Sequence, residues 1–346
     1  MIPSVLSLIG FFALAIGISY VMNFVAQELY ASKGIYEPMT ERSSHIRPVS
    51  RSGGVALFIS LIACFFVVNN FFQLDLSINF WFSLVIVFIG GIWDDIYKLR
   101  YHQKLVVQFA AGLLLSQSGF SVNSLHGLLG VEVIPPFLAT LFSLGVYVLV
   151  VNAINLVDGI DGLATFLFVL FVLHAGLLMW EASDPILLMV PITIGIVLPF
   201  LIFNLYRKKK AILGDSGSML LGTLVSYILF WMLDHRTTLP TDALINRFIL
   251  AISLLLYPLL DTLRVFVIRI KNGQHPFKAD RNHLHHLLID RGHTHLHAAL
   301  SIVLWSDFFL LIQLGGYTYW GWIGAVLWMV FWILGSGWVL FKTVIR

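Results

Sequence analysis

Acidic and amide side chains occur in short clusters, each beside a long apolar run. The first cluster is Asp94 with Asp95, and two adjacent carboxylates repel each other unless a cation or a proton lies between them. Oxygen ligands of this type suit Mg²⁺, so the pair favours a metal or proton site. The alternative is that the pair only marks the end of a helix, next to Lys98 and Arg100.

The second cluster combines two amides and two carboxylates in residues 152–164. Its members are Asn152, Asn155, Asp158 and Asp161. Their spacing of three predicts that they share one helical face. Gly159 and Gly162 would let a ligand approach the backbone there. Packing explains such a group poorly, so we interpret it as part of a substrate site.

The third cluster surrounds Asp215, in the string Gly214-Asp215-Ser216-Gly217-Ser218 before an apolar helix. The start of a helix offers a cap, free backbone N–H groups and a favourable dipole. These features suit a metal-bound phosphate, whereas the simpler alternative is a capped helix. We interpret the basic run 207–210 just before it as anchor residues and not as ligands.

Histidines are concentrated near the end of the chain, with seven of the 12 between positions 275 and 297. His283, His285, His286 and Asp280 would suffice as zinc ligands. However, no Cys lies nearby and there is no His-Glu-x-x-His helix. We therefore favour phosphate binding, in which His and Arg pair with diphosphate oxygens. His293, His295 and His297 are interpreted as residues of the membrane interface.

The composition places these clusters in a membrane protein. The 346 residues are 59% hydrophobic and 11% charged, and the mean hydropathy is +0.90. A water-soluble core of this length would leave large apolar patches exposed. The net charge of +3 is small, so nucleic acid is not expected as a partner. Cys64 is the single cysteine, which excludes a disulfide framework.

Apolar runs long enough to cross the bilayer predict an all-α polytopic protein with about eleven spans. They are 3–25, 53–72, 77–93, 104–120, 136–153, 163–180, 186–205, 217–233, 246–268, 297–314 and 318–341. If the N-terminus is outside and the C-terminus cytoplasmic, every Lys and Arg except Arg236 and Arg247 falls inside, as the positive-inside rule requires. The first run lacks a basic start and is expected to be retained.

This topology predicts one membrane domain, 1–346, whose polar clusters all face the cytoplasm. The active-site loops are expected at about 26–52, 94–104, 154–162, 206–216 and 264–297.

Five segments in this order resemble the bacterial polyprenyl-phosphate N-acetylhexosamine-1-phosphate transferases, which initiate surface polysaccharides such as O-antigen. They are Glu41-Arg42-Ser43-Ser44-His45 with residues 48–54, Asp94-Asp95 with Lys104, Leu105 and Gln108, residues 152–164, Asn204 with residues 214–218, and residues 261–286. Together they span about 40 to 290.

The resemblance implies a Mg²⁺-dependent transfer of a phospho-sugar from a UDP-N-acetylhexosamine to undecaprenyl phosphate, with release of UMP, at the inner membrane. Mn²⁺ is expected to substitute for Mg²⁺. The implied metal ligands are Asp215, Asp94 and Asp95. The implied catalytic residues are Asp94, Asp95, Asp158, Asp161, His283, His285 and His286, and the implied substrate-binding residues are Asn152, Asn155, Lys104, Arg264, Asp280 and Arg281.

Sequence details narrow the choice of substrate within the resemblance. The string His283-Leu284-His285-His286 is similar to that of the sugar-only initiators, which argues against a muramoyl-pentapeptide substrate, the alternative within the family. Two departures, Glu37 before Pro38 and 209–213 in place of Pro-Ala before an aromatic residue, leave the sugar undetermined. A homodimer is compatible with the sequence, which fixes no oligomeric state.

Two further hypotheses remain. A secondary transporter would place polar residues near the bilayer midplane, where only His174 and Asp307 lie. A non-catalytic scaffold would leave the clustered carboxylates unexplained.

Overall fold

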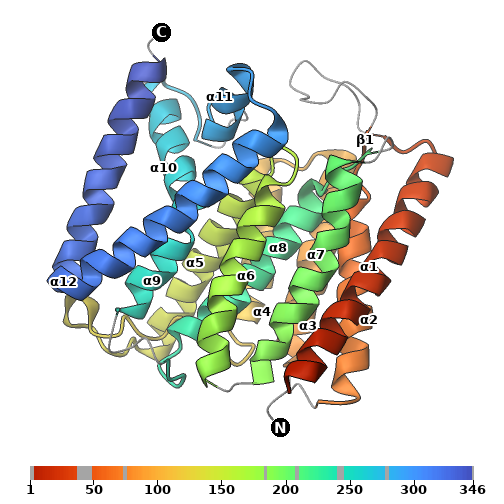
Figure 1. Ribbon diagram of the computed structural model, residues 1–346, viewed down its shortest axis with the longest axis horizontal. Helices are drawn as coiled ribbons and strands as arrows, with labels where there is room; N and C mark the ends of the chain where they lie inside the picture. The colour runs from red at the N-terminus through yellow and green to blue at the C-terminus, as the bar shows by residue number, and fades with distance from the viewer. Residues whose placement is uncertain are drawn as a thin grey trace.

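The computed structural model describes residues 4–36, 49–72, 76–182, 185–206, 210–239, 245–276 and 280–344. Of the residues singled out above, Glu37 and Pro38, 41–45, Pro48 and 207–209 lie outside these ranges. The protein is all-α and its helices form one bundle (Figure 1). The elements are α1 (Val5–Ser32), β1 (Val49–Ser50), α2 (Gly53–Asn69), α3 (Ile78–Tyr97), α4 (Tyr101–Leu115), α5 (Pro136–Val157), α6 (Leu163–Ala182), α7 (Met189–Leu205), β2 (Lys210–Ala211), α8 (Gly214–Leu233), α9 (Arg247–Leu254), α10 (Leu256–Lys271), α11 (Leu284–Asp290) and α12 (His295–Val344), with short 3-10 turns at Leu128–Gly130 and Pro185–Leu188.

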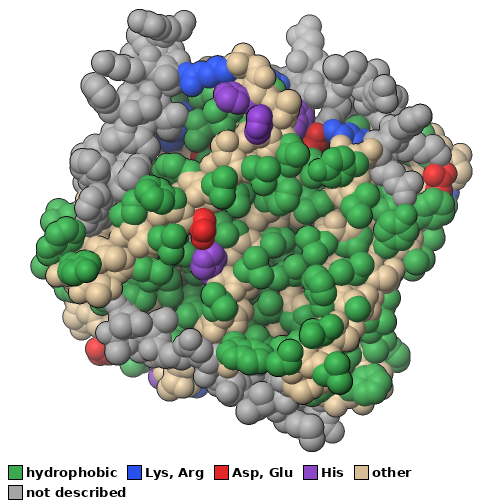
Figure 2. Space-filling view, in the orientation of Figure 1, with side chains coloured by type: hydrophobic (Ala, Val, Ile, Leu, Met, Phe, Trp, Pro, Cys, Tyr) green, Lys and Arg blue, Asp and Glu red, His purple; other side chains and the backbone are tan. Residues whose placement is uncertain are grey.

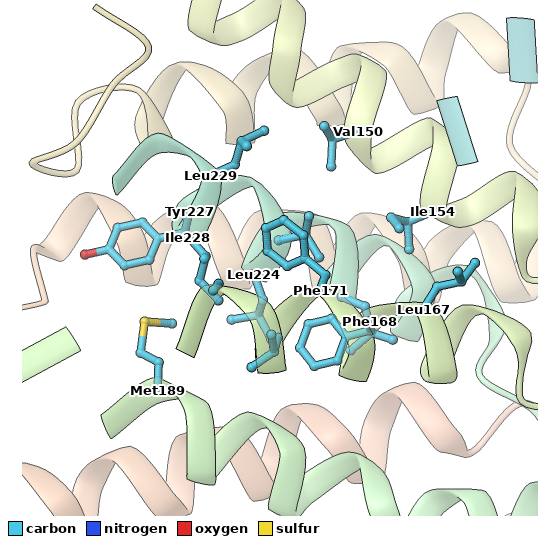
Figure 3. Close-up of a cluster of buried hydrophobic side chains, with 14 of the residues drawn as sticks. Val150, Ile154, Leu167, Phe168, Phe171, Met189, Leu224, Tyr227, Ile228 and Leu229 are labelled. Atoms are coloured by element: carbon cyan, nitrogen blue, oxygen red, sulfur yellow. The ribbon is translucent and has the colours of Figure 1, made fainter. Parts of the chain in front are cut away.

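Helix α8 forms the centre of the bundle. All of its residues from 216 to 233 are buried, as expected for a helix that is apolar on every side. Figure 3 shows Leu224, Tyr227, Ile228 and Leu229 of α8 surrounded by side chains of α5, α6 and α7. The central helix therefore holds Asp215, in its first turn, at a fixed place at one end of the bundle.

The outer surface is apolar, which identifies a membrane protein. Side chains such as Leu6 and Phe66 are 80% and 74% exposed, and hydrophobic side chains cover most of the face in Figure 2. Among the described residues, seven helices are long and apolar enough to span a bilayer, or eight if the bent pair α9 and α10 counts as one span. The polytopic prediction is confirmed, but the count of eleven is not.

Short or interrupted helices account for the difference in count. Helices α2 and α4 have 17 and 15 residues, shorter than a typical span. The last two predicted spans lie in one helix, α12, which is interrupted at Gly321, where φ is 64°. The ribbon of α12 turns sharply there into two arms (Figure 1).

Two glycines bring other helices onto the first turn of α8. A Cβ on Gly91 of α3 or on Gly54 of α2 would overlap the backbone of Ser216 or Gly217. The parallel pairing of β1 with β2, Val49 with Lys210 and Ser50 with Ala211, holds the chain segments on either side. As a result the ends of α2, α3 and α8 meet at one place, which we call the polar end of the bundle.

The opposite end contains the two basic residues that depart from the positive-inside pattern. Arg236 forms a bidentate pair with the fully buried Asp234, with N–O distances of 2.8 and 2.6 Å. Buried Arg247 donates to Thr237 Oγ1 at 2.6 Å and to Thr237 O at 2.8 Å. Both side chains stabilise the loop after α8 through these contacts, which accounts for two basic residues at this end.

Candidate active site

Asp215 accepts hydrogen bonds from three side chains that belong to different parts of the chain. Lys104 Nζ and Asn155 Nδ2 both donate to Oδ1, the latter at 2.8 Å. Arg51 Nη1 lies 3.3 Å from Oδ2. Helix α4, the end of α5 and the segment before α2 therefore converge on this carboxylate, which sits in the first turn of α8.

The carboxylate of Asp95, a residue of α3, caps the N-terminal end of α8. Its Oδ1 accepts from the backbone N–H of Asp215 at 2.8 Å and from Arg51 Nη1 at 2.6 Å. Its Oδ2 accepts from Ser216 N and Ser216 Oγ, at 3.1 and 2.7 Å. The prediction that these backbone N–H groups are free for a phosphate is wrong, because a carboxylate of the same chain satisfies them and gains from the helix dipole.

Asp94 pairs with Lys104, whereas its neighbour Asp95 pairs with Arg51. Lys104 Nζ lies 2.7 Å from Asp94 Oδ2, and the N–H of Leu99 donates to Asp94 Oδ1 at 2.8 Å. The two adjacent carboxylates thus use separate cations, Lys104 and Arg51, and each of these cations also contacts Asp215. Asp94 and Asp95 are therefore linked through Asp215, which both Lys104 and Arg51 contact.

The 158–162 loop differs from its predicted form. Helix α5 ends at Val157 and α6 begins at Leu163, so Asp158 and Asp161 lie on a turn and not on one helical face. The physical reason is in the sequence, because Gly162 adopts φ 78° and interrupts the helix. Asn152 and Asn155 do share the last turns of α5, but Asn152 pairs with Gln108 and not with Asp215.

The two carboxylates of this loop have opposite electrostatic environments. Burial, together with the charges of Asp215 and Asp161, raises the pKa of Asp158 well above its usual range. Burial would also raise the pKa of Asp161, but hydrogen bonds from His295 and Lys210 outweigh it and hold that pKa below its usual range. Asp158 therefore lies where added positive charge is favourable, whereas Asp161 is already neutralised by cations of the chain.

The loop carrying the histidines is organised by Asp261 of α10. His283 Nδ1 lies 2.8 Å from Asp261 Oδ2, and Arg264 Nη2 donates to Asp261 Oδ1 at 2.7 Å. The N–H of Leu284 also donates to Oδ1, at 3.1 Å. His283 and Arg264, expected at the substrate, are thus engaged in holding the loop on α10.

Asp280 and Arg281 also have partners within the chain. Arg269 Nε donates to Asp280 Oδ2 at 2.8 Å, and Arg281 Nη2 donates to Asp290 Oδ1 at 2.7 Å. Burial would raise the pKa of Asp280, but hydrogen bonds from Arg269 and Asn282 outweigh this effect and hold the pKa below its usual range. The structure brings neither side chain to Asp215.

His285 and His286 do approach the loop of Asp158. A Cβ on Gly159 would overlap the His285 ring and lie 2.9 Å from His286 Nε2. His285 Nε2 and His286 Nδ1 are buried and have no hydrogen-bond partner. Burial lowers the pKa of His285 well below its usual range and that of His286 to about 4. Both rings are therefore neutral at pH 7, each with one buried nitrogen that a ligand could satisfy.

The sequence assigned no role in the site to four residues of this arrangement, although Arg51 and Asp261 lie in segments that carry the resemblance. Arg51 and Lys210 pair with acidic residues of the site, His295 contacts Asp161 and Asp261 organises the histidine loop. The sequence indicates a membrane anchor at Lys210 and an interfacial residue at His295, and the structure shows in addition that both side chains contact Asp161. The available signal was charge balance, since five clustered carboxylates need basic partners.

The carboxylates of the site are of the chemical type that Mg²⁺ binds together with substrate oxygens. Within the described part of the chain no three His, Cys, Asp or Glu side chains converge as a metal cage. However, Arg51 Nη1 bridges Asp95 and Asp215, and Lys104 Nζ bridges Asp94 and Asp215, so each pair of carboxylates already shares one cation. Mg²⁺ commonly uses one or two carboxylates with phosphate oxygens and water.

The bundle and its cluster define a polytopic membrane protein with an acidic, cation-bridged site at one end. Residues 77–233 match the family model described as glycosyl transferase family 4. The chain is 31% identical over 290 residues to the decaprenyl-phosphate N-acetylglucosaminephosphotransferase of Mycobacterium leprae, covering 77% of this chain and 72% of that protein. It is 28% identical over 295 residues to the undecaprenyl-phosphate alpha-N-acetylglucosaminyl 1-phosphate transferase of Escherichia coli, covering 81% and 76%.

The chain belongs to the polyprenyl-phosphate N-acetylhexosamine-1-phosphate transferases, within glycosyl transferase family 4. It is thus a transferase enzyme, as the sequence predicted.

Proposed function

We propose that the protein transfers N-acetylhexosamine 1-phosphate from a UDP-N-acetylhexosamine to undecaprenyl or another polyprenyl phosphate and releases UMP. The observation that carries the proposal is the convergence of Lys104, Arg51 and Asn155 on Asp215 at the end of a membrane bundle. The named activities of the relatives supply the reaction, and both names specify N-acetylglucosamine as the sugar.

The chemistry joins two anions, so charge neutralisation is the main task of the site. An oxygen of the lipid phosphate forms a bond to the β-phosphorus of the sugar nucleotide, and the bond from that phosphorus to the bridging oxygen of UMP breaks. UMP leaves with the electron pair, and the product is a polyprenyl-diphospho-sugar. Because the lipid phosphate is already ionised at neutral pH, we propose direct attack without an aspartyl-phosphate.

Mg²⁺ is the proposed cofactor, with Asp215 and the Asp94–Asp95 pair as its protein ligands and Mn²⁺ as a substitute. When bound, the ion neutralises charge on the diphosphate. Lys104 and Arg51 already lie on the same carboxylates and would pair with phosphate oxygens. His285 and His286, each with an unsatisfied buried nitrogen, are the side chains of the histidine segment that remain suited to the diphosphate.

We further propose that the polar end faces the cytoplasm of a bacterium, in the inner membrane, with the N-terminus outside. The support is that the basic side chains near the polar end pair with its carboxylates, whereas Arg236 and Arg247 fasten the other end. A UDP-sugar is made in the cytoplasm and would reach the site from that side. The first step of a surface polysaccharide such as O-antigen would use this product.

The test is to incubate purified protein with undecaprenyl phosphate, Mg²⁺ and one of several sugar nucleotides, and to measure UMP. UDP-N-acetylglucosamine is expected to yield UMP and a lipid-linked sugar. UDP-N-acetylgalactosamine and UDP-N-acetylmuramoyl-pentapeptide show whether the site selects another sugar. If no sugar nucleotide yields UMP, the proposed function is wrong.

The transporter alternative has lost its sequence support. His174 Nε2 lies 3.1 Å from Asp307 Oδ1, and the two side chains are 26% and 38% exposed. The pair therefore lies on the outside of the bundle and lines no internal path in the described structure.

A further inference from the structure

Two aspartate–histidine pairs of opposite order join α12 to α6 and the loop before it. At the polar end, His295 Nδ1 of α12 lies 2.6 Å from Asp161 Oδ2, just before α6. Farther along, the order is reversed, because α6 contributes His174 and α12 contributes Asp307. The pairs are 13 residues apart on the α6 side and 12 residues apart on α12.

Asp161 is held too fully to present its carboxylate to a substrate. Lys210 Nζ and His295 Nδ1 contact Oδ2, and Asn204 Nδ2 lies 3.4 Å from Oδ1. The side chain is only 5% exposed. The role of Asp161 is therefore to hold the 158–162 loop in place.

The position of this loop matters because Asp158 and Gly159 belong to it. The N–H of Asp158 donates to Asn155 O at 3.3 Å, and the side chain of Asn155 donates to Asp215 Oδ1 at 2.8 Å. Gly159 lies against the rings of His285 and His286, which are so close that a Cβ on Gly159 would overlap them. A shift of Asp161 would move both residues relative to Asp215.

The second pair sets where α12 lies on α6. His174 Nδ1 donates to Leu170 O at 2.9 Å, so Nε2 faces Asp307 and the two groups share one proton or form an ion pair. Ionisable groups within membrane-spanning helices are costly when unpaired, and a slide of α12 by one turn would separate these two. A polar contact of this kind fixes helix register.

The two pairs are connected by a rigid element. Twelve residues of helix correspond to about 18 Å. Helix α12 packs on α6 and crosses its outer side (Figure 1). A displacement at Asp307 therefore reaches His295 through one continuous helical arm.

We propose that the first arm of α12, residues 295–320, positions the 158–162 loop. The His174–Asp307 contact sets the register of this arm on α6, and His295, together with Lys210, holds Asp161. His295, His174 and Asp307 are positioning residues and touch no reacting atom. The effect on catalysis rests on the proposed function, whereas the effect on the loop does not.

The test compares kcat and KM for UMP release in His295→Leu, His174→Leu and the double variant. Each single change is expected to lower kcat about tenfold, because small misplacements of reacting groups are costly, and to leave KM within about threefold. The double variant should be no slower than His295→Leu alone, since both act through the same contact. Additive losses would overturn the proposed coupling.

Restored contacts separate positioning from general damage. His295→Gln keeps an N–H donor for Asp161, and the exchange His174→Asp with Asp307→His keeps the pair with its order reversed. Both should recover kcat to within about threefold of the unchanged protein, if the contact is what matters. Leu304→Ala, on the same arm and 68% exposed, is the control and should change neither kcat nor KM.

A second readout does not depend on activity. Hydrogen exchange of the backbone in residues 158–162 should quicken about tenfold in His174→Leu, although the substituted side chain lies in the membrane part of α6. Unchanged exchange in His174→Leu would overturn the inference even if the protein is active. If the unchanged protein releases no UMP while exchange responds, the proposed function fails and the positioning role stands.

Discussion

Asp215 and Asp161 show how similar residues take different parts in one site. Asp215 is contacted by Lys104, Asn155 and Arg51, of which Lys104 also contacts Asp94 and Arg51 also contacts Asp95. Asp161 is enclosed by Lys210, His295 and Asn204 and belongs to the scaffold of its loop. The sequence shows two carboxylates in Gly-rich surroundings, and only their partners distinguish a ligand candidate from an anchor.

Asp215→Asn should lower kcat for UMP release by about 10²-fold or more, because the cation-bridged centre loses its charge. The variant should remain folded, since Asn keeps the volume of the side chain. UMP release at saturating Mg²⁺ is the measurement. Glu132→Gln, an exposed residue at the other end, makes the same kind of change and should retain full activity. Wild-type kcat in Asp215→Asn would remove this residue from the catalytic centre.

His286 should contribute to the pH dependence of stability. Its pKa is about 4 in the folded protein and roughly 6.5 in an unfolded chain. The unfolded state therefore binds more protons between these values, and stability that is complete above pH 6.5 is lost as the pH falls toward 4.

His286→Gln should thus reduce the loss of stability between pH 7 and pH 5. The measurement is the midpoint of thermal unfolding in detergent at both pH values. His297→Gln, at an exposed position, serves as the control. Equal falls in the unchanged protein and in His286→Gln would contradict the prediction.

At the scale of elements, glycines determine which helices reach the site. Gly54 and Gly91 let α2 and α3 touch the first turn of α8, and Gly159 lets α11 pack on the 158–162 loop. The sequence predicted the positions of the helices, since every apolar run overlaps a helix, although the run 246–268 covers two helices, α9 and α10, and the run 104–120 continues past the end of α4. It did not predict which glycines serve for close packing, because that depends on the partner across the contact.

Gly159→Ala should lower kcat about tenfold, because the added Cβ must displace the His285 ring from its place beside the loop. Gly145→Ala, on the helix α5 that precedes this loop, meets no atom within 4 Å and is the control. It should leave kcat unchanged and stabilise the helix slightly. UMP release and thermal unfolding would be measured for both. Equal kcat in the two variants would show that the His285 contact does not matter.

At the scale of the whole molecule, the two ends of the bundle differ in how they use charge. Basic side chains at the polar end pair with clustered carboxylates. Arg236 and Arg247 at the other end close loops through Asp234 and Thr237. The bundle between them has an apolar exterior (Figure 2).

This difference predicts the orientation, which cysteine labelling can measure. In a Cys64→Ala background, Glu132→Cys should react with a membrane-impermeant maleimide in intact cells. Arg291→Cys, also at an exposed position, should react only after permeabilisation. The physical reason is that basic residues near span ends are retained in the cytoplasm. The reverse labelling pattern would overturn the proposed orientation.

The membrane class, most of the helices and the family can be inferred from the sequence alone, because hydrophobic runs and short motifs are local in the chain. The sequence also located Asp94, Asp95, Asn155 and Asp215, which the structure brings together. The partners of these carboxylates follow from the folded structure and could not be read from the sequence. Arg51, Lys210 and His295 lie 44, 49 and 134 residues from the carboxylates they contact. Pairing over such distances follows from helix packing, which brings together side chains that no local pattern connects.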